Sequence, residues 1–156
     1  MAVNSKREQI LVKVTSNMED ISSINRVERV RPSFADLGNF AGTQLPLVAV
    51  VGKLPKPEPK RSGRISGLVG KFVSDLGVDL FCYAMDNVNP DSTVSDLTDD
   101  IWAKVHSDPN LITDDYPDGL TLQVDVVPEV KVGTWDPYVV FKIGCVYKYV
   151  HTTGGI

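Results

Sequence analysis

Two segments of the chain have apolar residues on one helical face only, and this pattern constrains the fold more than any other. The first runs from about Lys6 to Ile21, and its apolar face consists of Ile10, Leu11, Val14, Met18 and Ile21. The second lies between Asn89–Pro90 and Asp108–Pro109, and its apolar face consists of Val94, Leu97, Ile101 and Val105. A helix with one apolar side has to lie against another element, so both helices need a sheet to cover.

The start of each helix has its own signal. Ser5 followed by Glu8 is a capping box, and Ser92 and Thr93 are cap candidates for the second helix. On the first helix, the face opposite the apolar one is polar and consists of Lys6, Lys13 and Asn17. We expect this polar face to point away from the sheet.

Five apolar or alternating runs supply the strands, at residues 26–30, 45–51, 78–84, 120–126 and 139–149. The last run alternates with period two, which places Lys142 and Lys148 on the side opposite its apolar residues. A chain of 156 residues fits one domain. The sequence therefore predicts a single α+β domain over residues 1–156, with a mainly antiparallel or mixed β-sheet of about five strands and two helices packed on one face.

Two segments between these elements look different from the rest. Residues 34–44 contain Asp36, Gly38, Asn39 and Gly42 and are expected to form an irregular loop. Residues 53–64 alternate proline with charge, and three prolines at every second position favour an extended chain. Because apolar residues follow, we expect a projecting β-hairpin arm over about residues 53–76 that contacts a partner. The predicted interface residues are Lys53, Lys56, Lys60, Arg61, Arg64, Leu68 and Phe72.

The arm concentrates five positive charges within twelve residues, although the net charge of the chain is −4. An acidic chain is unsuited to non-specific binding of nucleic acid, which requires a basic surface. The basic stretch then has three interpretations: a solvated loop, a DNA-binding strip, or a surface that meets an acidic protein. We favour the last, in which opposite charge steers docking.

The sequence marks no catalytic residue, no metal site and no cofactor motif. The only histidines are His106 and His151, and no metal-binding spacing occurs. Residues 66–71 contain glycines and a lysine without the spacing of a phosphate-binding loop, and they are expected in the arm. The acidic residues at 114–119 do not match a calcium loop and favour a turn over an ion site. We therefore expect a protein that assembles rather than an enzyme.

Both cysteines, Cys82 and Cys145, lie in apolar strand-like runs. We expect them to be buried and reduced, with a disulfide as the alternative. No apolar stretch reaches the ~18 residues of a membrane span, and the first residues do not form a secretory signal. The expected setting is a cytoplasm, without a membrane.

The order of these features resembles the tail terminator (tail-completion, head–tail joining) proteins of tailed bacteriophages. The similarity covers most of the chain and is one of order, spacing and size. The proline content of the arm and the Asp114–Pro117 segment depart from the family pattern. The matching features, in chain order, are a helix opening with Ser5–Ile10, a short strand near Arg29 and Arg31, a strand at Leu45–Val50, a variable arm, a helix ending in His106–Leu111, and a final hairpin closing with Val146–Tyr149.

The resemblance implies a structural virion protein of the tail or neck, assembled in the host cytoplasm. Such a subunit would form a homohexameric ring that caps the tail tube, stops its polymerisation and offers a docking surface to the head-side connector or stopper protein. DNA would pass through the ring without specific binding. The alternatives are another phage neck, connector or assembly protein, a small ligand-binding or nucleic-acid-binding module, and an enzyme.

Overall fold

The computed structural model describes residues 5–39, 44–53, 71–85, 88–135 and 138–152 of the chain. It has a five-stranded mixed sheet of order β1-β2-β3-β5-β4, in which β1 and β2 are parallel and the other neighbours antiparallel. The predicted α+β class is confirmed. The elements are α1 (Lys6–Glu19), β1 (Arg26–Glu28), α2 (Phe34–Asn39), β2 (Leu47–Gly52), β3 (Lys71–Met85), α3 (Pro90–Ser107), β4 (Gln123–Trp135) and β5 (Tyr138–Thr152).

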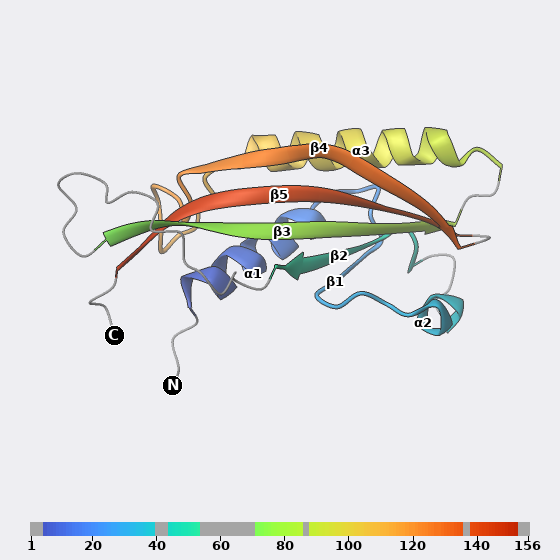
Figure 1. Cartoon of the computed structure of the whole chain (residues 1–156), viewed down its shortest axis with the longest axis horizontal. Helices are drawn as coiled ribbons and strands as arrows, with labels where there is room; N and C mark the ends of the chain where they lie inside the picture. Colours follow the sequence, from blue (N-terminus) through green and yellow to red (C-terminus); the bar gives the residue numbers. More distant parts are fainter. Residues whose placement is uncertain (1–4, 40–43, 54–70, 86–87, 136–137, 153–156) are drawn as a thin grey trace.

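The helices α1 and α3 cover one face of the sheet, as the sequence predicts (Figure 1). Their apolar stripes meet the residues that alternate on β2, β3 and β5, because every second side chain of a strand points to the same face. The strand side of this core consists of Val48, Val50, Leu76, Val78, Leu80, Cys82, Phe141, Ile143, Cys145 and Tyr147.

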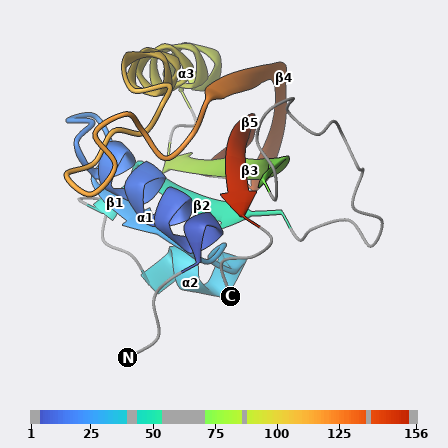
Figure 2. The ribbon, with the colours of Figure 1, turned by 90° about the vertical axis from the view of Figure 1, so that its left-hand side faces the viewer.

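The short helix α2 lies on the opposite face and corrects the prediction of an irregular loop for residues 34–39; residues 40–43 of that loop lie outside the described residues (Figure 2). Its start is a reciprocal cap: the Asp36 amide donates to the Ser33 hydroxyl at 3.1 Å, and the Ser33 amide donates to the Asp36 carboxylate at 3.0 Å. Leu37 is fully buried with Leu47 and Tyr83 in a second, smaller core. The Ser-x-x-Asp spacing was the available signal for this helix.

The helix α1 begins as predicted and ends two residues early, at Glu19. Ser5 accepts a hydrogen bond from the Glu8 amide, while the Glu8 carboxylate binds Arg29 at 2.8 Å. The assignment of Asn17 to the polar face is wrong. Its side chain is buried, and its amide donates to Asp108 at 2.9 Å.

The helix α3 begins at Pro90, with Asn89 as its N-cap, so the cap candidates Ser92 and Thr93 lie inside the helix. Proline fits the first turn of a helix because its missing N–H would have no partner there. The helix ends before Asp108, as predicted. Within the described residues, no helix has both the length and the apolar character that a membrane span needs.

The strand β3 is much longer than the predicted strand at residues 78–84. It pairs with β5 along its whole length, and its first seven residues extend beyond the end of β2, where Gly52 pairs with Val78. The predicted arm is therefore wrong from Lys71 onward, because that part belongs to the sheet. Leu76 in particular is buried in the main core.

The chain between α3 and β4 passes through the acidic turn. The Gly119 amide donates to the Tyr116 carbonyl at 2.9 Å, and Gly119 has φ of 102°. This confirms the predicted turn at residues 114–119. The strand that follows begins at Gln123, later than predicted, and Leu122 remains exposed.

Candidate functional site

Of the seven predicted interface residues, only Lys53 has a described side chain. Phe72 is placed by its main chain, as the second residue of β3, where it pairs with His151. The other five, Lys56, Lys60, Arg61, Arg64 and Leu68, lie outside the described residues. The site can therefore be built from the point where the basic segment leaves the sheet, which we call the root and define as Arg7, Gly52, Lys53, Gly77 and Asp79.

The main chain of Lys53 is held by two elements of the fold. Its amide donates to the Gly77 carbonyl of β3 at 2.8 Å. Its carbonyl accepts a hydrogen bond from the Arg7 guanidinium of α1 at 2.7 Å. A residue tied to both a strand and a helix has little backbone freedom, so the chain leaves β2 from a fixed position.

The side chain of Lys53 lies across β3 at Gly77. A Cβ at position 77 would be 2.8 Å from the Lys53 Cδ, so only glycine leaves room for this path. The Lys53 Nζ then reaches to 3.8 Å from the Asp79 Oδ1. That oxygen is buried and has no hydrogen-bond partner among the described residues, so the ammonium supplies its opposite charge.

A second close approach lies on the other side of the root. A Cβ on Gly52 would be 3.0 Å from both the Arg7 guanidinium and the Leu11 Cδ1. Glycine at this position lets α1 come close enough for Arg7 to reach the Lys53 carbonyl. The root is thus built from two glycines, one on each face, and three charged residues.

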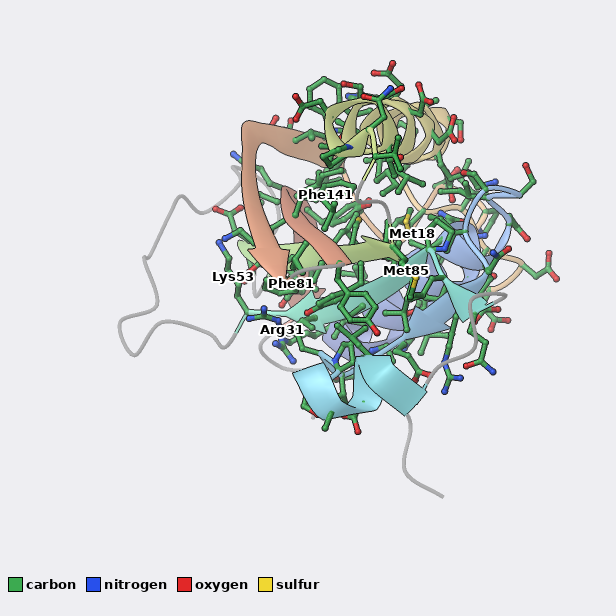
Figure 3. The ribbon with its side chains drawn as sticks, turned by 90° about the vertical axis from the view of Figure 1, so that its right-hand side faces the viewer. Met18, Arg31, Lys53, Phe81, Met85 and Phe141 are labelled. Atoms are coloured by element: carbon green, nitrogen blue, oxygen red, sulfur yellow. The ribbon has the colours of Figure 1, made fainter. Side chains whose placement is uncertain are left out.

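Another cation is fixed nearby on the same face as Asp79. The Arg31 guanidinium carbon lies 4.0 Å from the centre of the Phe81 ring, and Arg31 Nε donates to the Tyr83 hydroxyl at 3.0 Å. A guanidinium over an aromatic ring is attracted by the negative ring face. Figure 3 shows Arg31 beside Phe81, with Lys53 on the same side of the molecule.

Beyond the root, this face of the sheet has no described helix on it. The helix α2 lies near the opposite end, where β3 finishes (Figure 1). We call the remaining part the open face. It mixes half-buried valines with polar residues and charges of both signs, and its described residues include Val73, Asp75, Asp79, Gln123, Asp125, Lys142, Val146, Lys148 and Val150.

The residues that the structure describes contain no group of three potential metal ligands. A shallow groove of about 550 Å³ is lined by Lys13, Ile112, Thr113, Asp114 and Pro117. Cys82 and Cys145 are both free and buried, as predicted. Burial, together with the charge of Asp79, raises the pKa of the Cys145 thiol to about 12, and burial alone raises the pKa of Cys82.

Comparison with known proteins adds no family to this picture. A scan against protein-family models finds no match, and a search of curated proteins finds none either. The assignment of a function therefore depends on the residues of this chain.

Sequence reasoning missed most of the root. Arg7 belongs to the predicted start of the first helix, and Gly77 lies between the predicted arm, which ends at about residue 76, and the predicted strand at residues 78–84. One local signal did exist: Asp79 is a charged residue flanked by Val78 and Leu80 in an otherwise apolar strand. A charge in such a position needs a compensating partner, which the sequence does not identify.

Proposed function

We propose that this chain is a ring-forming structural subunit of the tail terminator type, which caps a bacteriophage tail tube and docks the head-side connector. In this proposal it belongs to the virion, and genome DNA passes through the ring without specific binding. The observation that supports it best is the root. A strongly basic, proline-rich segment starts from a position fixed by α1 and β3, which is what an assembly contact needs.

A fixed root lowers the entropy cost of docking. Ordering a free loop on a partner costs conformational entropy for every residue that becomes fixed. Here the first residue is already held by Arg7 and Gly77, and three prolines restrict the residues that follow. The segment can then contact a neighbouring subunit or the tube at a lower cost than a glycine-rich loop of equal length.

The charge of the segment supports a protein partner with an acidic surface. Opposite charges raise the rate of encounter and orient the partners before contact. This steering is screened over a Debye length of about 8 Å at physiological salt. A ring through which DNA must pass quickly gains nothing from basic residues facing its lumen. We therefore place the segment at contacts with protein, outside the channel.

The first test is assembly. We expect the purified chain to form closed rings at high concentration, detected by light scattering and negative-stain microscopy, and to bind the ends of purified tail tubes. Deletion of residues 55–63 should leave a folded subunit that assembles or docks poorly. A Gly/Ser replacement of equal length is the matched comparison, since it keeps the number of residues in the segment and removes its charge and stiffness.

The second test is charge. Reversal of Lys60 and Arg61 to Glu should slow docking, and raising the salt concentration should slow docking of the parent. A deletion variant that assembles and docks as the parent does would exclude a role for the segment. A parent that forms no ring and binds no tube would overturn the proposal. A ring that binds only the head-side connector would identify a neck protein of another kind.

A further inference from the structure

The two strands at the centre of the open face are matched residue by residue. Asp75 on β3 is opposite Lys148 on β5, so an acid faces a base. Val73 is opposite Val150, and two apolar residues therefore meet at the next position on this face. Gly77 is opposite Val146, which pairs the smallest residue with a branched one. At these three positions the β3 residue therefore matches its β5 partner in charge, in apolar character or in size.

This matching makes the open face complementary to a second copy of itself. A two-fold axis that runs parallel to the strands, between β3 and β5, superimposes β3 of one copy on β5 of the other. Asp75 of each copy then faces Lys148 of the other, and Val73 faces Val150. Two sheets stacked in this way have nearly aligned strands, the common arrangement of packed sheets about 10 Å apart.

We propose that two copies of this chain pair through the open face, in a two-fold contact built on Asp75, Lys148 and the two valines Val73 and Val150. The occupant is identified by charge complementarity. A one-signed partner would be repelled by either the aspartate or the lysine, whereas a second copy satisfies both. The valines are half-buried in the single chain and would lose their remaining exposure in the pair.

The size of the face sets the strength of the pair. Residues 71–79 extend about 30 Å at about 3.4 Å per residue, and β3 and β5 together span about 10 Å; β4 adds a third strand only from Gln123, which pairs with Lys148. The flat area of roughly 300–400 Å² is at most half of the ~800 Å² per partner found in stable complexes. The Lys53 side chain also occupies the space over Gly77, which limits the contact to the end of the face where β3 begins. We therefore expect a weak pair that forms at high subunit concentration.

This contact goes beyond the proposed ring. A ring is built from head-to-tail contacts, whereas a two-fold contact closes after two members. If the chain forms rings, the expected species is therefore a pair of rings; if it stays a single subunit, the expected species is a dimer. Rings that never pair would overturn this inference and leave the proposed function standing. Pairs of single subunits without rings would support this inference and overturn the proposed function.

The experiment uses two charge reversals, Asp75→Lys and Lys148→Asp, and analytical ultracentrifugation over a range of concentrations. Each variant alone places like charges against each other twice in the pair, so we expect pairing at least tenfold weaker than in the parent. An equimolar mixture of the two variants should restore pairing, because Lys at 75 of one variant then faces Asp at 148 of the other. An effect within one chain cannot be restored by mixing.

The control is Asp114→Lys, which makes the same charge change in an exposed turn and should leave pairing unchanged. Thermal unfolding at low concentration establishes that each variant is folded. If a reversal prevents folding, Asp75→Asn and Lys148→Gln remove the attraction without repulsion and should weaken pairing less. A parent that does not pair at millimolar concentration, or a mixture that pairs no better than its members, would overturn the inference.

Discussion

Gly77 provides the sharpest test of how the root is built. In Gly77→Ala, the new Cβ would lie 2.8 Å from the Lys53 Cδ, while carbon atoms pack best at about 3.5–4.0 Å. The lysine side chain is flexible, so it should move by about 1 Å and give up its position near Asp79. The backbone of Gly77 need not move, because its φ lies outside the left-handed region.

Two opposing effects determine the free energy of unfolding of this variant. The Lys53 side chain is 56% exposed, so losing its ion pair with Asp79 costs only about 0.2–1 kcal/mol. Alanine in a strand is favoured over glycine by about 0.5–1 kcal/mol, because glycine loses more freedom on folding. Gly77→Ala alone should therefore change stability by less than about 1 kcal/mol, which makes a single variant uninformative.

A double-mutant cycle separates the two effects. In the Lys53→Ala background there is no Cδ to displace, so Gly77→Ala should stabilise the protein by about 0.5–1 kcal/mol. The difference between the two backgrounds is the coupling energy, expected at about 0.2–1 kcal/mol in urea unfolding followed by tryptophan fluorescence. Zero coupling would refute the idea that Gly77 exists to accommodate Lys53.

The matched control is Gly52→Ala. Its Cβ would be 3.0 Å from the Leu11 Cδ1, and Leu11 is buried in the core and cannot move away freely. Overpacking of this kind costs about 1–3 kcal/mol, and Lys53→Ala should not relieve it. If Lys53→Ala reduced the cost of Gly52→Ala and of Gly77→Ala by the same amount, its effect would be on the general stability of the chain and not on the contact with Gly77.

Three further predictions concern the rest of the fold. Gly119→Ala should destabilise the protein by about 2–4 kcal/mol in urea unfolding. The new Cβ would lie 2.3 Å from the Asn110 carbonyl oxygen, and the backbone φ of 102° is unfavourable for alanine. A smaller loss of stability would show that the turn relaxes. Combined Cys82→Ala and Cys145→Ala should cost about 1–3 kcal/mol in total, and neither thiol should react with a thiol reagent in the native state, since both are buried. The Arg29 guanidinium lowers the pKa of Glu8 below its ordinary value of 4.5. The pair should therefore stabilise the fold fully above pH 4.5 and lose this contribution as the pH falls through the lowered pKa. This pH dependence of the free energy of unfolding should be absent in Glu8→Gln and present in the control variant Glu19→Gln.

The elements that the sequence predicted well are those with a local period. The stripes of α1 and α3 repeat every three or four residues, and β5 alternates over eleven residues, so a short window contains the whole signal. The start of β3 has no such signal. Ser74, Asp75 and Gly77 interrupt the apolar alternation, and only the pairing with β5 makes this segment a strand.

The root could not be predicted because its contacts are distant in the sequence. Arg7 reaches the Lys53 carbonyl over 46 positions, and Asp79 meets Lys53 from a different strand. Asn17 shows the opposite problem. Because asparagine is polar, we predicted that Asn17 is exposed. Asp108, the hydrogen-bond partner that permits its burial, lies 91 positions away in the sequence. Sequence patterns give the framework of such a domain more reliably than the contacts between its parts.

The edges of the sheet limit how this chain can associate. β1 is only three residues long, and a strand that short offers few main-chain groups to a partner. β4 is a long edge strand, but it contains Pro128, and its pairing shifts register between Val127 and Lys131. Proline removes a main-chain donor, and a bulge turns the edge away from a flat partner. Both edges are therefore poor templates for strand addition. Among the described elements, the open face and the helices remain for contacts with other subunits, and neither of our proposals uses a sheet edge.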